Sequence, residues 1–125
     1  MIVGLGLDVC EIDRIESMLQ RWGTRFTEKI FTERERAYSL SKVQAAQHLA
    51  ARFAVKEATL KALGVPKGLS WKEMEVVGGG RQKPELVLTG VARQAADALG
   101  IERFHLTISH AGGMAVAVVI AERGA

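Results

Sequence analysis

Apolar residues recur along this chain with two different spacings, which indicate where strands and helices alternate. Residues 1–7 form a short apolar run with glycines, typical of a buried strand that ends at Asp8. Residues 11–22 carry apolar side chains three and four positions apart, which predicts a helix that stops at the following glycine. Thr32 and Glu35 have the spacing of a capping box, so we expect the next helix to start there.

A long helix is predicted in the middle of the chain, from about residue 44 to residue 63. This segment is rich in Ala and Leu, and Gly64 followed by Pro66 stops it. The second half is predicted to contain strands over 73–77, 85–88, 104–109 and 114–121, and a helix from residue 89 or 90 to about 99. An Ala-Gly-Gly sequence at 111–113 favours an antiparallel hairpin between the last two strands. This order of elements indicates the α+β class.

Composition is that of an ordinary globular domain. Of the 125 residues, 48% are hydrophobic and 25% are charged, which excludes a disordered tail, a collagen-like repeat and a disulfide scaffold. The length accommodates a single domain, residues 1–125. The longest apolar run, 114–121, is far shorter than the roughly 20 residues of a membrane-spanning helix, and the amino terminus has no signal-peptide pattern. Cys10 is the only cysteine, so we expect a cytoplasmic protein without an internal disulfide or a membrane span.

The charge of the chain is mildly basic and unevenly distributed. The formal net charge is +3, and the excess of Lys and Arg lies in the first half, above all between Arg21 and Lys42. This bias indicates an acidic partner or a phosphate-bearing ligand, whereas a solvated surface of mixed charge is the simpler interpretation.

The predicted long helix carries a carboxylate where apolar side chains are expected. At about 100° per residue, Glu57 lies about 40° from Phe53, inside the apolar stripe. A carboxylate in such a stripe is costly unless it is paired or bound to a cation. Two interpretations follow: an i,i+4 ion pair between Glu57 and Lys61, or a metal ligand.

Asp8, which closes an otherwise apolar strand, is a second isolated carboxylate. It could be a simple turn-former. Together, however, Asp8 and Glu57 are what a magnesium site needs, because Mg²⁺ takes few protein ligands and completes its shell with water and phosphates. Arg52, Lys56 and Lys61 flank Glu57 and could bind those phosphates.

Other candidate motifs do not have the residues or the spacing that their chemistry requires. Gly4-Leu5-Gly6 begins like a dinucleotide-binding fingerprint, but the third glycine is replaced by Val9. His105 and His110 are five residues apart, so on one strand they point to opposite faces and do not form a metal pair. Cys10 has no obvious partner base, and we expect it to be a small buried residue.

Four stretches of the chain resemble the motifs of the holo-acyl-carrier-protein synthases, which belong to the 4'-phosphopantetheinyl transferase superfamily. They are Gly4-Leu5-Gly6-Leu7-Asp8-Val9, Phe31-Thr32-Glu33 with Glu35, Arg52-Phe53-Ala54-Val55-Lys56-Glu57-Ala58 with Lys61-Ala62-Leu63-Gly64, and Ile108-Ser109-His110. The opening motif and the signature helix are together highly specific, and the resemblance extends from residue 2 to about residue 121. It implies a mainly antiparallel sheet with a long helix and shorter helices packed on it.

The resemblance also implies an activity: transfer of the phosphopantetheine arm of coenzyme A to a serine of apo acyl carrier protein, for fatty acid biosynthesis. Asp8 and Glu57 would hold Mg²⁺ on the pyrophosphate, and Lys61 would stabilise the leaving group. Either Glu57, through a water, or His110 would take the serine proton.

The resemblance also implies the residues that contact coenzyme A and the oligomeric state. The expected coenzyme A contacts are Arg52, Phe53, Lys56, Lys61, Pro84, Ser109 and His110. Gln82 stands where the family often has glycine, which makes the turn at Pro84 less typical. Relatives of this length form homotrimers with sites at the subunit boundaries. For the acidic carrier protein we expect docking on Arg14, Met18, Arg21 and Arg25, the first three of which share one helix face.

Two other functions fit parts of the sequence. A nucleic-acid-binding module would explain the basic charge, but it needs stacking aromatics on a basic stripe, and the few aromatics here lie mostly in apolar runs. A non-catalytic carrier-protein adaptor would keep the basic first helix, and Asp8 and Glu57 would then be dispensable.

Overall fold

The computed structural model describes residues 1–124 as five helices, five strands and one 3₁₀ turn. In chain order these are β1 (Ile2–Glu11), α1 (Ile12–Trp22), α2 (Thr24–Ile30), α3 (Glu33–Leu40), α4 (Ala45–Ala62), η1 (Trp71–Glu73), β2 (Met74–Gly79), β3 (Gln82–Leu88), α5 (Gly90–Ala98), β4 (Ile101–Ala111) and β5 (Met114–Arg123). None of the helices within residues 1–124 is long and apolar enough to cross a membrane.

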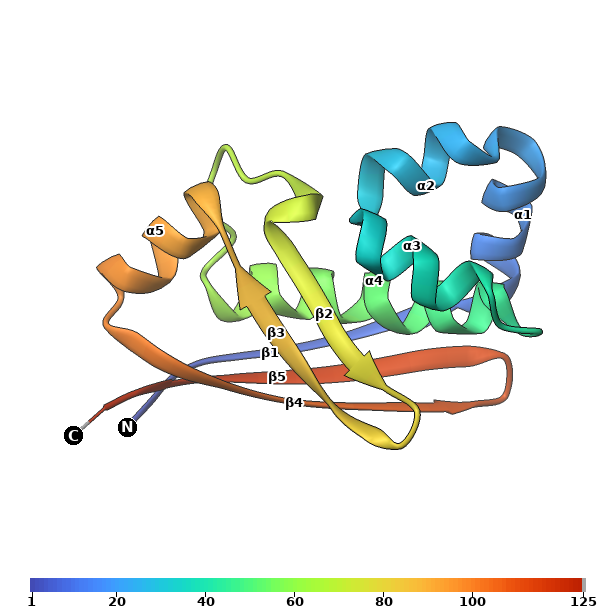
Figure 1. Ribbon diagram of the computed structural model, residues 1–125. Helices are drawn as coiled ribbons and strands as arrows, with labels where there is room; N and C mark the ends of the chain where they lie inside the picture. Colours follow the sequence, from blue (N-terminus) through green and yellow to red (C-terminus); the bar gives the residue numbers. More distant parts are fainter. Residues whose placement is uncertain (125) are drawn as a thin grey trace.

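The strands form two antiparallel sheets, so the predicted α+β class is confirmed. The larger sheet has the order β1-β5-β4, and β2 pairs with β3 in a separate hairpin. Helix α4 lies along one face of the larger sheet, the β2–β3 hairpin crosses beside it, α1–α3 gather at one end and α5 lies at the other (Figure 1). The first and last strands of the chain are therefore neighbours in the centre of the fold.

A backbone-to-backbone contact sets the position of α4 on the sheet. A Cβ atom on Gly4 or Gly6 of β1 would overlap the carbonyl oxygens of Ala62 and Ala58 of α4. Only glycine permits this approach, because it has no side chain to hold the helix away. Every residue of β1 that alternates with these glycines on the same face is consequently brought close to α4, and Asp8 is one of them.

The prediction of one apolar stripe on the long helix is wrong. α4 is buried around most of its circumference, because the sheet covers one side and α3 and β2 cover another. Its buried residues include the charged Arg52 and Lys56, whereas Phe53, which we placed at the centre of the stripe, is only partly buried. Phe53 therefore faces a pocket rather than the core.

Several element boundaries differ from the predictions. Strand β1 continues to Glu11, so Asp8 lies inside the strand and not at its end. Helix α2 and the turn η1 were not predicted, because both are too short for a periodic pattern. The capping box of Thr32 and Glu35 is confirmed, and so is the hairpin between β4 and β5, whose Gly112 and Gly113 both have positive φ.

The face of the larger sheet that points away from α4 is apolar and uncovered in the single chain. Leu5, Leu7 and Val9 of β1 are 63%, 53% and 49% exposed there. Their partners Val116, Val118 and Ile120 on β5 continue the same surface and are only half-buried. We call this surface the open sheet face.

Candidate functional site

Two pockets flank different sides of α4. The first, which we call the aromatic pocket, has a volume of about 420 Å³ and lies between α1, α2, α4 and η1; its walls include Met18, Trp22, Phe26, Phe53 and Trp71. The second, the glycine pocket, has a volume of about 510 Å³ and lies between α3, α4, the β2–β3 hairpin and β4; its walls include Tyr38, Arg52, Gly79, Gly80, Pro84 and His110.

Asp8 and Glu57 meet beside the contact between β1 and α4. Burial raises the pKa of Glu57 first, and the hydrogen-bonding and negative charge of Asp8 raise it further. Arg14 and Lys61 oppose the shift with their positive charges. The two carboxyl groups thus form a like-charged pair, in which the ionised state of Glu57 is disfavoured.

Lys61 is paired with Asp8 rather than with Glu57. Its Nζ lies 3.1 Å from Asp8 Oδ1 and donates to the carbonyl oxygen of Leu7 at 2.9 Å. The i,i+4 ion pair that we considered is therefore not what explains Glu57. Lys61 is instead a partly exposed ammonium group fixed at the carboxylate pair.

The carboxylate pair fits a hard divalent cation. Two oxygen ligands that repel each other and favour a bound proton are stabilised when a cation replaces that proton. Within residues 1–124 no cluster of three or more His, Cys, Asp or Glu side chains could hold a metal ion. An ion here would therefore complete its shell with water and phosphate oxygens, which is the habit of Mg²⁺.

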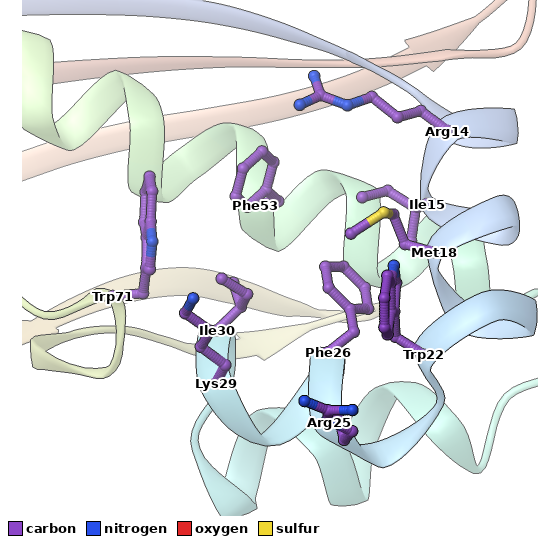
Figure 2. Close-up of a pocket in the computed structure, with 10 residues that line it drawn as sticks. All are labelled: Arg14, Ile15, Met18, Trp22, Arg25, Phe26, Lys29, Ile30, Phe53 and Trp71. Atoms are coloured by element: carbon purple, nitrogen blue, oxygen red, sulfur yellow. The ribbon is translucent and has the colours of Figure 1, made fainter.

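The carboxylate pair adjoins the aromatic pocket. Phe53 precedes Glu57 by four residues on α4, so the two side chains lie one turn apart on the same side of the helix. Arg14 also lines this pocket, and its charge acts on Glu57. Figure 2 shows the Arg14 guanidinium at the edge of the pocket, with the rings of Phe53 and Trp71 below it.

The aromatic pocket has an apolar floor and a cationic rim. The Phe53 and Trp71 rings pack against each other with centroids 5.3 Å apart. At the other side, two guanidinium groups lie near the Trp22 ring: Arg21 is 5.7 Å and Arg25 is 5.6 Å from its centroid. These distances are within the range of cation–π attraction, which orients both arginines.

The structure brings together most of the residues expected to contact the carrier protein. Arg14, Met18 and Arg25 line the aromatic pocket, and Arg21 lies beside it on Trp22. Trp22 and Trp71 were not expected at the site from the sequence. For Trp22 a signal existed, because it follows Met18 by four residues and is adjacent to Arg21.

The glycine pocket contains three of the expected coenzyme A contacts, namely Arg52, Pro84 and His110. The Arg52 side chain is 3% exposed, donates from Nη2 to the Gly78 carbonyl at 2.7 Å and lies 4.2 Å from the Tyr38 ring centroid. Among residues 1–124, no group accepts a hydrogen bond from its Nε. An anion in this pocket would add an ion-pair partner for the buried guanidinium, on which the Glu35 carboxylate also acts.

Histidines complete the glycine pocket. His110 Nε2 lies 3.2 Å from Gln47 Nε2, and His48 packs edge-on against Tyr38. Burial and the neighbouring charges of Arg52, Lys42 and His110 lower the pKa of His48. Tyr38 and His48 were not expected in this pocket from the sequence, because neither belongs to a local sequence motif.

Three expected coenzyme A contacts, Lys56, Lys61 and Ser109, line neither pocket. Lys56 is fully buried and ion-paired inside the protein, so the structure brings it to neither pocket. Ser109 pairs with Val116 and lies on the open sheet face, because side chains alternate along β4 and His110 points to the other side.

Cys10 takes no part in the site. Burial is the main cause that raises the pKa of its thiol to about 11, so the thiol stays protonated at neutral pH. This agrees with the expectation of a small buried residue.

Comparisons with known proteins identify one family. The profile of the 4'-phosphopantetheinyl transferase superfamily matches residues 4–119. The chain is 49% identical over 125 residues to the holo-[acyl-carrier-protein] synthase of Anaeromyxobacter dehalogenans, covering 98% of this chain and 97% of that one. It is 42% identical to the enzyme of the same name from Geotalea daltonii, with 98% and 100% coverage.

Solved structures agree with this assignment. The holo-[acyl-carrier-protein] synthase of Neisseria meningitidis superposes with a TM-score of 0.84 at 30% identity, covering 98% of this chain and 100% of that one. The enzyme of Bacillus anthracis, solved in complex with CoA (3',5'-ADP), gives a TM-score of 0.80 at 37% identity with 99% coverage of both chains. The resemblance found in the sequence motifs is thereby confirmed: this chain belongs to the 4'-phosphopantetheinyl transferase superfamily, among the holo-[acyl-carrier-protein] synthases.

Proposed function

We propose that this protein transfers the 4'-phosphopantetheine arm of coenzyme A to a serine hydroxyl of an apo acyl carrier protein and releases 3',5'-ADP. The observation that carries the proposal is the Asp8–Glu57 pair with Lys61, placed beside a pocket that has an apolar floor and a cationic rim. Such a centre suits the transfer of a charged phosphoryl group between a small molecule and an acidic protein.

In the reaction, the serine oxygen forms a bond to the phosphorus of the arm while the phosphoanhydride bond breaks, and its electron pair leaves with 3',5'-ADP. Asp8 and Glu57 would hold Mg²⁺, which when bound neutralises charge on the pyrophosphate oxygens. Lys61, fixed by Asp8, is placed to stabilise the negative charge of the leaving group. The proton acceptor is either Glu57, through a water, or His110, which lies in the glycine pocket that a neighbouring subunit would bring to this centre.

We assign the meeting point of the two substrates to the aromatic pocket. This pocket contains Phe53, an expected contact of coenzyme A, together with Arg14 and Met18, expected contacts of the carrier protein. An apolar floor suits the uncharged arm, and a cationic rim suits an acidic helix of the carrier. The serine and the phosphopantetheine would therefore approach each other at the end of the pocket nearest to Glu57.

We assign the nucleotide end of coenzyme A to the glycine pocket and propose a homotrimer with shared sites. Arg52 and Glu57 point about 140° apart on α4, so one coenzyme A molecule does not easily reach both from a single chain. The open sheet face offers an apolar surface for association, since exposed apolar patches of this kind mark interfaces. The glycine pocket of one subunit would then complete the carboxylate centre of its neighbour.

Mixed trimers test this arrangement. Subunits carrying Asp8→Asn and subunits carrying Arg52→Met are each impaired alone when coenzyme A is near the wild-type KM. When they are mixed, part of the activity should return, because some subunit boundaries then combine an intact carboxylate centre with an intact glycine pocket. Asp8→Asn mixed with Glu57→Gln is the control and should not recover, since both carboxylates belong to one chain. Equal behaviour of the two mixtures would contradict shared sites.

The transfer itself is tested by mass. The protein is incubated with coenzyme A, Mg²⁺ and an apo acyl carrier protein, with and without a chelator of divalent cations. We expect the carrier to gain the mass of one phosphopantetheine group only when Mg²⁺ is present, and we expect this activity in the cytoplasm, where carrier and coenzyme A meet. Binding of the carrier without any gain in mass would instead favour the non-catalytic adaptor.

A further inference from the structure

Two opposite charges are fully buried in the core, away from both pockets. The side chains of Lys56 and Glu35 are each 0% exposed, and Lys56 Nζ lies 2.7 Å from Glu35 Oε1. Burying such a pair has a large desolvation cost for each ion, and apolar residues of equal volume often stabilise a core better. Stability alone therefore does not explain why this ion pair is buried.

All three donors of the Lys56 ammonium group are occupied. Besides Glu35, Lys56 donates to the carbonyl oxygens of Trp71, at 3.0 Å, and of Met74. These two carbonyls lie at the start of η1 and at the residue that follows it. Lys56 thus binds both ends of the turn that carries the Trp71 ring.

Glu35 connects the pair to two further elements. Its Oε1 accepts from the backbone N–H of Thr32 at 3.0 Å, which closes the capping box of α3. Its Oε2 accepts from the backbone N–H of Val76 in β2 at 2.9 Å. The Lys56–Glu35 pair therefore joins α3, α4, η1 and β2 through directional bonds, which an apolar substitute could not supply.

The element that this network fixes is a wall of the aromatic pocket. The carbonyl of Trp71 is held by Lys56, while the Trp71 ring packs on Phe53, three residues before Lys56 on α4. Figure 2 shows both rings facing the pocket. Trp71 belongs to a short 3₁₀ turn, and the bonds from Lys56 to its carbonyl and to that of Met74 tie this turn to α4.

From this geometry we infer that Lys56 is a positioning residue: with Glu35 it clamps the carbonyl of Trp71, and thereby sets the Phe53–Trp71 wall against which the phosphopantetheine arm lies. The clamp itself is a property of the structure. Its effect on transfer rests on the proposed function, because it assumes that the aromatic pocket receives the arm.

The clamp is tested with the double variant Glu35→Gln/Lys56→Met. It removes both charges, so no unpaired ion is left in the core, and it keeps the volume of both side chains. We expect a folded protein whose kcat/KM falls by about tenfold to a hundredfold, since small displacements of positioning groups have effects of this size. The fall should appear in kcat and in the KM of coenzyme A.

A second readout does not depend on activity. The chain has two tryptophans, so in a Trp22→Phe background Trp71 is the only one. Acrylamide should quench Trp71 fluorescence more strongly in the double variant than in its parent. Ile101→Ala, which opens a cavity in the buried start of β4, is the matched control: it lowers stability and should leave both kcat/KM and quenching unchanged.

The outcomes separate the two claims. If the double variant folds and shows unchanged quenching and kinetics, the clamp is wrong. If quenching rises while the wild type transfers no phosphopantetheine, the clamp stands and the proposed function fails. If the double variant does not fold, the single variant Glu35→Gln replaces it, because it keeps an acceptor oxygen for Lys56. Acrylamide should then quench Trp71 more strongly than in the parent, by less than the increase expected for the double variant. Unchanged quenching would overturn the inference.

Discussion

The two pockets hold cations against aromatic rings in different ways. At the aromatic pocket, the Trp22 ring has two exposed arginines near it, Arg25 at the rim and Arg21 beside it. In the glycine pocket, the Tyr38 ring lies against Arg52, which is buried, and against the exposed Lys42 at 4.8 Å. Exposed charges are screened by salt and mainly steer encounter, whereas a buried charge binds its ligand directly. The first arrangement therefore suits a large acidic protein and the second a small anion.

The largest effect on activity is expected at the carboxylate pair, where the substrates held by the two pockets would react. Asp8→Asn or Glu57→Gln should lower kcat by at least about a hundredfold, because each removes a charged ligand of the Mg²⁺ that would neutralise the pyrophosphate. The KM values of coenzyme A and carrier should change much less, and circular dichroism should show an intact fold. Near-normal turnover of either variant at saturating Mg²⁺ would remove the carboxylates from the reaction.

A smaller effect, confined to one substrate, is expected in the glycine pocket. Arg52→Met should raise the KM of coenzyme A by about tenfold to a hundredfold, since a hydrogen bond to a charged group contributes about 1.5–3 kcal/mol. The KM of the carrier should stay unchanged, and added salt should not reproduce the effect. Lys42→Met is the control on the exposed side of the Tyr38 ring, and a loss of coenzyme A binding equal to that of Arg52→Met would mean that burial does not distinguish the two cations.

At the rim of the aromatic pocket we expect a modest effect that depends on salt. Reversing Arg14 or Arg21 to Glu should slow association with the carrier several-fold at low ionic strength and flatten its salt dependence, because rim charges act at long range. The KM of coenzyme A should not change. The test is the affinity for the carrier, measured at several salt concentrations for wild type and Arg21→Glu. If both proteins have equal affinities and the same dependence on salt, α1 does not take part in docking.

The smallest effect concerns stability without metal. Because the pKa of Glu57 is raised in the folded protein, its contribution to stability is complete below the ordinary glutamate pKa of 4.5 and is lost as the pH rises through the raised value. The metal-free wild type should therefore lose a few degrees of Tm between acidic and neutral pH, and Glu57→Gln should lose less. Thermal melts at several pH values with a chelator present measure this, and identical pH profiles of the two proteins would show that the pKa of Glu57 is not raised in the folded protein.

Local patterns predicted the parts of the molecule that depend on local chemistry. The capping box at Thr32 and the Gly-Gly hairpin each depend on a few adjacent residues, and both are found where we expected them. The helical angle of Glu57 also marked it as unusual before any partner was known. Its partner Asp8 was suspected for the wrong reason, because the strand does not end there.

What the sequence could not show depends on contacts between distant segments. Lys56 was expected at the ligand because it lies next to Glu57, yet it is buried against Glu35, 21 residues earlier in the chain. No local pattern predicts such a pairing, since it requires α3 and β2 to pack on the same side of α4. Tyr38 and His48 were missed for the same reason: only the fold brings them to Arg52.

The contact of Gly4 and Gly6 with Ala62 and Ala58 has an implication for how this protein can vary. The spacing between the two carboxylates is set by main chains alone, so it is insensitive to most substitutions around it. A single methyl group at Gly6, chemically the smallest change available, would instead lift the helix from the strand and separate Asp8 from Glu57. We therefore expect bulky or charged substitutions on the surface to leave the spacing of the carboxylates unchanged. One added carbon atom at Gly6, which binds no ligand itself, would change it.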